Sequence, residues 1–99
     1  MRTPHPPSIT DALAGFGAGL RGYRVRRRIP VARAAGQAAI SRSTLHKVER
    51  GDPGVSMGIY AAVLECYGLL PRLDDLIDVR RDRAGLAFEA AQQPRRIRA

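Results

Sequence analysis

The sequence contains no tryptophan, and its aromatic side chains are limited to two Phe and three Tyr. A hydrophobic core must therefore be built from Leu, Ile, Val and Ala, a composition that suits packed helices. With 99 residues, of which 44% are apolar, the chain is long enough for one modest core and too short for two. We therefore expect a single all-α domain.

Long apolar runs are also missing, because nowhere do about 18 apolar residues follow one another, as a membrane span requires. Residues 1–7 contain three Pro and no apolar segment of the kind that an export signal has. We expect residues 1–9 to form a frayed N-terminal arm. The one cysteine, Cys66, has no partner for an internal disulfide, and its apolar surroundings favour a buried, inert thiol. These features predict a cytoplasmic protein without membrane contact.

Acidic residues are absent from one long stretch of the chain. Residues 12–48 contain eight Lys or Arg and no Asp or Glu, residues 49–78 contain six acids and two bases, and residues 79–99 contain six bases and two acids. This uneven distribution predicts a basic face suited to a polyanion. A basic face kept only for solubility is the alternative, although ordinary surfaces intersperse both signs.

The spacing of apolar residues predicts five short helices within residues 10–78, followed by a partly flexible C-terminal tail over residues 79–99. Leu73, Leu76 and Ile77 share one face of the fifth helix, which begins near Pro71. Cap and turn residues mark the boundaries: Thr10, Ser41 and Ser56 as N-caps, Pro30 between the first two helices, and Gly51 and Gly68 as C-terminal stops.

The third predicted helix, residues 41–50, has two unlike faces. Leu45 and Val48 point inward, and five polar residues fall on the opposite side: Arg42, Ser43, His46, Lys47 and Arg50. Two short helices joined by a tight turn, with an outward polar face on the second, are typical of a helix-turn-helix. We therefore expect this helix to enter the major groove of double-stranded DNA.

Residues 40–51 (ISRSTLHKVERG) resemble the recognition-helix signature of the XRE/Cro family of repressors. Residues 55–69 resemble that family's fourth helix and residues 20–27 its first, so the resemblance covers residues 13–77. It implies a five-helix, lambda-repressor-like domain. Two departures from the family pattern stand out: Pro30 and Val31 replace a phosphate-binding Gln, and Ala39 replaces the usual turn Gly. If Ala39 is left-handed, the strain is about 1 kcal/mol.

The resemblance implies base contacts from Arg42 and Ser43 at the start of this helix. Arg42 is expected to pair with guanine O6 and N7 through its fork of donors, and His46 and Lys47, one turn later, are predicted to reach a base edge or a phosphate. A merely exposed charge is the alternative for Arg42. Six further residues are predicted phosphate contacts: Arg21, Arg28, Arg33, Ser41, Thr44 and Arg50. A solvated helix end is the alternative for residues 26–28.

The resemblance also implies a structural ion pair between Arg24 and Glu49. Catalytic, cofactor and metal sites are not expected, because His5 and His46 lie far apart in the chain and neither has metal-ligand spacing with Cys66. The glycines at positions 15, 17 and 19 lie inside a helical pattern, where they favour close helix packing instead of phosphate binding.

A single module of this size makes few DNA contacts, so we expect a homodimer on a palindromic operator with half-sites roughly 34 Å apart. The fifth helix and the tail are the expected dimer contacts, since Leu86 and Phe88 have no place in a five-helix core. The basic residues 95–98 are either an arm that touches DNA or a handle for a partner.

The sequence as a whole is similar to HipB-like antitoxins, on the evidence of the loop at residues 50–58 and the compact length. This resemblance implies a repressor of its own operon that also binds and neutralises a HipA-like kinase toxin. The alternative is a stand-alone prophage-type or housekeeping XRE regulator with no toxin partner. A cationic RNA- or membrane-binding protein is a third hypothesis, which rests on net charge alone.

Overall fold

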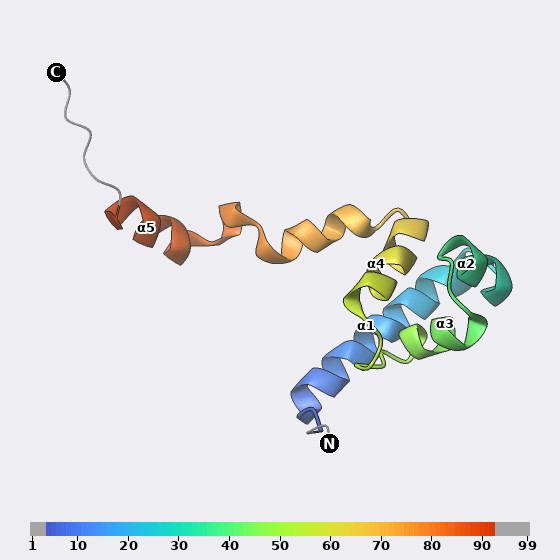
Figure 1. The fold of residues 1–99 in the computed structure, drawn as a ribbon. Coiled ribbons are helices and arrows are strands. Elements are labelled where there is room, and N and C mark those ends of the chain that lie inside the picture. The colour runs from blue at the N-terminus through green and yellow to red at the C-terminus, as the bar shows by residue number, and fades with distance from the viewer. Residues whose placement is uncertain (1–3, 93–99) are drawn as a thin grey trace.

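The computed structural model describes residues 4–92, and its regular structure in that range is entirely helical (Figure 1). The elements are α1 (Pro7–Arg26), α2 (Val31–Gln37), α3 (Arg42–Glu49), α4 (Met57–Cys66), the 3₁₀-helices η1 (Leu70–Ile77) and η2 (Val79–Arg81), and α5 (Arg83–Gln92). The all-α class is confirmed. The predicted count of five helices is too low for the described residues, because η2 and α5 lie within the predicted tail. The basic residues 95–98 lie outside the described residues.

The prediction that Thr10 caps the first helix is wrong. Helix α1 begins at Pro7, and Pro6 is its extended N-cap residue with φ −65° and ψ 155°. Proline suits the first helical position because its φ is already helical and its missing N–H would have no partner there. Thr10 lies within the first turn, where its hydroxyl donates to the Pro7 carbonyl over 3.3 Å.

Helix α1 packs on α3 through a glycine. The buried residues of α1 are Gly17, Leu20 and Arg24, whereas Phe16, which the sequence places on the apolar stripe, is 41% exposed. A Cβ atom at Gly17 would lie 2.6 Å from the Val48 carbonyl oxygen, so the backbones of α1 and α3 meet directly. The expectation of close packing therefore holds at Gly17. Positions 15 and 19 have no atom near enough to require glycine.

The core lies where α1, α2, α3 and α4 meet. Leu45, Val48 and Val63 are its largest fully buried side chains. The buried residues of α2 are both alanines, Ala34 and Ala35, and their small size lets α2 lie close to α3. Helix α4 contributes Tyr60 and Leu64 beside Val63, with Tyr67 just after its end. The first four predicted helices thus form the packed body that carries α3.

The turn between α2 and α3 contains a residue in the left-handed conformation that is not glycine. Ala39 has a φ of +57°, and its N–H donates to the Gly36 carbonyl over 3.1 Å. The Ile40 N–H donates to the Ala35 carbonyl over 3.0 Å, which closes the end of α2. Because a Cβ crowds the backbone in this region, Ala39 stores roughly 1–2 kcal/mol of strain.

The predicted fifth α-helix is the 3₁₀-helix η1, and Ile77 does not share a face with Leu73 and Leu76. Leu73 is half-buried against the core, but Leu76 is 78% exposed and Ile77 is 91% exposed. A 3₁₀-helix has three residues per turn, so Leu73 and Leu76 are aligned and Ile77 points elsewhere. The prediction assumed the period of an α-helix and was wrong at Ile77.

Residues 79–92, here called the C-terminal extension, lead away from the packed body (Figure 1). The described chain measures 65 Å along its longest axis, and neither η2 nor α5 contains a buried residue. Within residues 4–92, no helix combines the length and apolarity that would let it cross a membrane.

Candidate nucleic-acid interface

Both ends of α3 are fixed by local hydrogen bonds. Ser41 is the extended N-cap residue, and its Oγ accepts from the Thr44 N–H over 3.0 Å, which confirms the predicted cap. Gly51 follows the helix with a φ of +70°. The Asp52 N–H then donates to the Lys47 carbonyl over 3.0 Å. Helix α3 is therefore short and defined at both ends.

The side chains of α3 divide into a buried and an exposed set. Leu45 and Val48 are completely buried. The other side consists of exposed residues: Arg42, Ser43, His46 and Lys47. Within residues 4–92, none of these four side chains forms a hydrogen bond or ion pair with another residue. The exposed face of α3 thus presents an array of hydrogen-bond donors that is free to bind a ligand.

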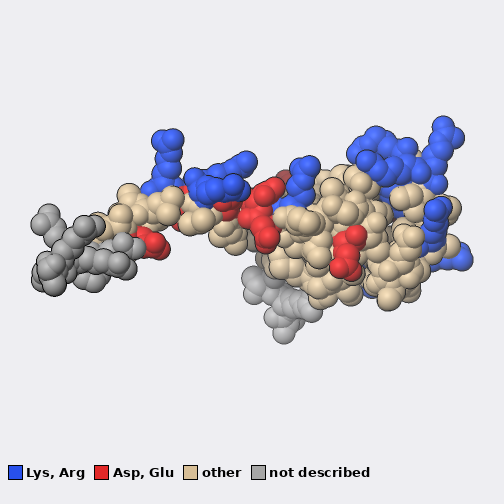
Figure 2. All heavy atoms as spheres, turned by 90° about the horizontal axis from the view of Figure 1, so that it is seen from above, with Lys and Arg blue, Asp and Glu red and all other residues tan. Residues whose placement is uncertain are grey.

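The six predicted phosphate contacts come from α1, the loop after it, α2, and α3 with its two cap residues. Those at positions 21, 28, 33, 41 and 50 are exposed, and Thr44 is half-buried. Figure 2 shows Lys and Arg side chains gathered at the end of the molecule away from the C-terminal extension. A second group lies along the extension itself. A polyanion that contacts α3 therefore approaches the molecule at a basic end.

The two hydroxyl groups at the start of α3 differ in what they can still donate. Ser41 Oγ donates to Thr44 Oγ1 over 2.9 Å while it accepts from the Thr44 N–H. The Ser41 hydroxyl proton is therefore used inside the protein. The Thr44 hydroxyl accepts that bond, and its own proton remains available for a phosphate oxygen.

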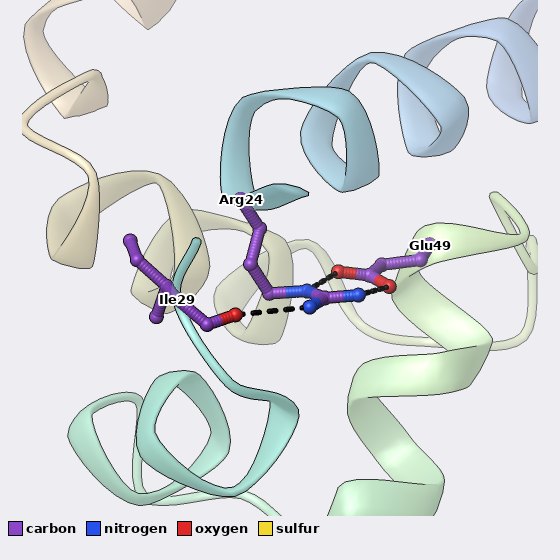
Figure 3. A network of polar contacts seen from close by, with 3 residues as sticks. All are labelled: Arg24, Ile29 and Glu49. Carbon is purple, nitrogen blue, oxygen red and sulfur yellow. Dashed lines mark hydrogen bonds and ion pairs between the residues drawn. The ribbon is translucent and has the colours of Figure 1, made fainter. Parts of the chain in front are cut away.

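A buried ion pair joins α1 to the end of α3 (Figure 3). Arg24 Nε donates to Glu49 Oε2 over 2.7 Å, and Nη2 donates to Oε1 over 3.0 Å. The remaining nitrogen, Nη1, donates to the Ile29 carbonyl over 3.0 Å. Arg24 and Glu49 are only 8% and 7% exposed. The hydrogen bond to Glu49 raises the pKa of Arg24, and burial opposes it. This pair holds α3, α1 and the loop before α2 in one geometry.

A tyrosine pair that the sequence did not reveal supports the end of α1. The rings of Tyr23 and Tyr67 stack with centroids 5.0 Å apart, and the Tyr23 hydroxyl donates to the Tyr67 carbonyl over 2.9 Å. The Arg27 guanidinium lies over the Tyr23 ring, 3.5 Å from its centroid. The middle arginine of the basic run at residues 26–28 is therefore held against Tyr23. Tyr67 fits the apolar spacing of α4, but that spacing does not predict that its ring stacks on Tyr23.

The Tyr67 hydroxyl is buried and has no hydrogen-bond partner among the described residues. Burial raises the pKa of Tyr67, with the Glu49 carboxylate adding to the effect. Cys66 beside it is half-buried instead of buried as predicted, and burial raises the pKa of its thiol as well. A raised pKa keeps the thiol protonated, and a protonated thiol is a poor nucleophile.

In the part of the chain that the structure describes, no three His, Cys, Asp or Glu side chains lie close enough together to hold a metal ion.

A family model described as a helix-turn-helix domain matches residues 16–78, which are 63 of the 99 residues. No curated protein and no solved structure shows a significant similarity to the chain. The matched range contains the exposed face of α3, and it ends before the C-terminal extension.

Proposed function

Because the chain belongs to the helix-turn-helix domain family, we propose that it is a sequence-specific, double-stranded-DNA-binding transcriptional repressor that places α3 in the major groove. The observation that carries this proposal is the free, exposed face of α3. A helix with its side chains is about 10–12 Å wide, and the major groove of B-DNA is about 12 Å wide. The buried Leu45 and Val48 anchor the helix from the other side.

The exposed residues of α3 would divide the reading of bases by position. Arg42 and Ser43 are the first two helical residues, so they reach deepest when the N-terminal end enters the groove. Arg42 has the fork of donors that matches guanine O6 and N7. His46 and Lys47 follow one turn later and reach either a base edge or a phosphate. The unpaired state of all four side chains supports this assignment.

Phosphate contacts would set the register of α3 without reading sequence. The residues proposed for them are Arg21, Arg28, Arg33, Ser41, Thr44 and Arg50. The free hydroxyl proton of Thr44 supports its role, and the exposure of the four arginines supports theirs. Ser41 contributes mainly by capping α3, because its own proton is used by Thr44.

We propose further that two copies bind one palindromic operator. The exposed face of α3 offers four candidate base contacts, too few for selective binding by one copy. A two-fold dimer doubles the contacts and reads half-sites roughly 34 Å apart.

The similarity of the sequence to HipB-like antitoxins supports a more specific proposal: repression of its own operon and direct binding of a HipA-like kinase toxin. The stand-alone regulator remains the second candidate, because α3 would serve both equally. An adjacent kinase-like reading frame whose product co-purifies with this chain would favour the antitoxin. A neighbouring gene of another kind would favour the stand-alone regulator.

The salt dependence of DNA binding tests the central proposal. A binding site is first selected from random duplexes, and its affinity is then measured from 50 to 200 mM salt beside a scrambled duplex. We expect the logarithm of the binding constant to fall linearly with the logarithm of salt concentration, by about 0.9 per phosphate neutralised. The selected duplex should bind more tightly throughout. A flat salt response, or equal affinity for both duplexes, would contradict the proposal.

A further inference from the structure

An apolar groove lies between the N-terminal half of α1, the side of α4 and η1. Its volume is about 360 Å³, and every residue that lines it is apolar or aromatic. Those used below are Leu13, Phe16, Met57, Tyr60, Leu64 and Leu76. Phe16 is 41% exposed and Met57 is 73% exposed, so the groove is open to solvent. The Tyr60 hydroxyl, its one polar side-chain group, already donates to the Asp52 carbonyl over 2.8 Å.

The same chain carries an apolar helix face that has nothing to pack on. In α5, Ala84, Ala87, Phe88 and Ala91 follow one another at the i, i+3, i+4, i+7 spacing of one helix face. Phe88 is 69% exposed, and α5 contains no buried residue. Small side chains on both sides of one large ring suit a helix that lies in a shallow groove and inserts that ring. Figure 1 shows α5 standing clear of the packed body.

The connection between η1 and α5 directs α5 away from its own groove. Asp78 Oδ1 accepts from the Arg80 N–H over 2.9 Å, and the Arg80 guanidinium donates to both Asp78 oxygens over 3.1 and 2.8 Å. Asp82 Oδ1 then accepts from the Gly85 N–H over 2.9 Å. For α5 to enter its own groove, the chain would have to reverse near residues 77–82. The two caps hold this connection in a course that leads away from the body, so the groove of a second copy is the one that α5 can enter without rearrangement.

Charge favours the same arrangement. Three arginines stand just before the apolar face of α5, at positions 80, 81 and 83. Acidic residues flank the groove along the chain: Asp52 precedes the lining residue Pro53, and Asp74 and Asp75 lie between Leu73 and Leu76. Figure 2 shows acidic side chains on the body beside the start of the extension, and a further acidic group near the outer end of the extension itself. An extension in a partner's groove brings these opposite charges together.

We propose that two copies of this chain exchange their C-terminal extensions, with α5 of each copy lying in the apolar groove of the other and Phe88 inserted between α1 and α4. Each chain supplies one groove and one α5, so a two-fold axis makes both contacts identical and closes the assembly. Because the contact occurs twice, each exchange needs to bury only half of the roughly 1,200–2,000 Å² that stable interfaces bury. No residue of α3 lines the groove, so the exchange leaves the DNA-reading face free.

This inference rests on the proposed function only in that two copies act together, and it is tested without DNA. The mass of the full chain in solution is measured over a range of concentrations for the wild type, Phe88→Asp and Met57→Glu. Both positions are largely exposed, so these substitutions leave the fold intact, which thermal unfolding verifies. We expect a wild-type dimer, and a dimer dissociation constant at least tenfold higher in either variant. Ala90→Asp is the matched control, because position 90 is about 200° around α5 from Phe88.

Mixing the two variants separates exchange from other kinds of contact. Met57→Glu keeps an intact α5, and Phe88→Asp keeps an intact groove, so a mixture forms a hetero-complex through one exchange contact that neither variant forms alone. A monomeric wild type, a dimer unchanged by both substitutions, or a mixture that stays monomeric would overturn the exchange. If the monomer still binds DNA selectively, the proposed function stands without it. If an exchanged dimer ignores DNA sequence, the proposed function fails and the exchange stands.

Discussion

At the scale of single residues, the proposed DNA contacts divide into side chains that read bases and charges that only position α3. Arg42 is exposed, unpaired and first in the helix, which is the geometry of a base contact. Arg33 is also exposed but belongs to α2, and it is proposed to contact only the backbone of a duplex bound by α3. Loss of Arg42 and loss of Arg33 should therefore change the preference for DNA sequence differently.

Replacement of Arg42 by Ala is expected to cost about 1–3 kcal/mol on the selected duplex, because a bidentate pair with one guanine is lost. Preference at one base pair should relax, while other positions keep their preference. Binding titrations against single-base variants of the duplex measure both effects.

Arg33→Ala is the control for Arg42→Ala, and it is expected to weaken binding to all duplexes alike and to lower the salt slope by about one unit. Equal losses on selected and scrambled DNA for Arg42→Ala would show that Arg42 contacts phosphate only.

The buried hydroxyl of Tyr67 gives a second prediction at the residue scale. Because this group has no partner among residues 4–92, Tyr67→Phe should raise the free energy of unfolding by about 1 kcal/mol, since an unsatisfied buried hydroxyl costs roughly that much. Tyr60→Phe removes a 2.8 Å hydrogen bond to the Asp52 carbonyl, so it should lower stability by about 0.5–1.5 kcal/mol. Denaturant unfolding of both variants measures the contrast.

The pH dependence of stability tests the same two tyrosines, Tyr60 and Tyr67. Burial raises the pKa of both Tyr60 and Tyr67, so the folded state retains protons that the unfolded state releases above pH 10 or so. Stability is then complete below that pH and is lost as pH rises through the raised values. Tyr67→Phe should remove part of this alkaline loss. An equal loss of stability in both Phe variants at neutral pH would point to a partner for the Tyr67 hydroxyl.

At the scale of elements, the turn between α2 and α3 retains strain that one substitution can release. Ala39 has a φ of +57° and is exposed. Ala39→Gly should raise the melting temperature, because release of roughly 1–2 kcal/mol of left-handed strain outweighs the added freedom of the unfolded chain. Ala32→Gly, at an exposed position inside α2, is the control and should lose about 1 kcal/mol. A loss of stability in both variants would contradict the left-handed conformation at position 39.

The ion pair between α1 and α3 makes the position of the reading helix depend on one carboxylate. Glu49→Ala leaves the Arg24 guanidinium buried without its partner, so we expect a loss of about 3–5 kcal/mol. The double variant Arg24→Leu, Glu49→Leu buries no charge and should recover much of that loss. Thermal unfolding measures both, and an unchanged melting temperature for Glu49→Ala would show that the pair carries no stability.

The sequence predicted those elements whose boundaries depend on local chemistry, and it failed where tertiary context decides. Ser41 and Ser56 cap α3 and α4 as expected, because each side chain bonds its own helix. Thr10 has the same cap chemistry, but the preference of Pro7 for the first turn prevailed. Ile77 was misplaced because apolar spacing alone does not distinguish a 3₁₀-helix from an α-helix.

At the scale of the whole molecule, the packed body and the C-terminal extension differ in how far they are predictable. The body follows from apolar spacing, since burial of Leu45, Val48 and Val63 determines which faces meet. The ion pair partners came from a family resemblance, because spacing does not identify contacts between residues 25 positions apart. The extension has no buried residue, so no burial pattern in the sequence reveals its direction. Its course depends on the two caps formed by Asp78 and Asp82, and such local hydrogen bonds do not reveal from the sequence which way the extension runs.

The glycine contact between α1 and α3 has a consequence for how such a protein acquires a new target. Where two backbones touch at Gly17 and Gly51, there is no side chain whose change of shape would let α3 tilt or slide. On the proposed function, this contact fixes the orientation in which α3 meets DNA. A change of operator preference is then expected to come from exchange of the outward side chains of α3 on an unmoved frame.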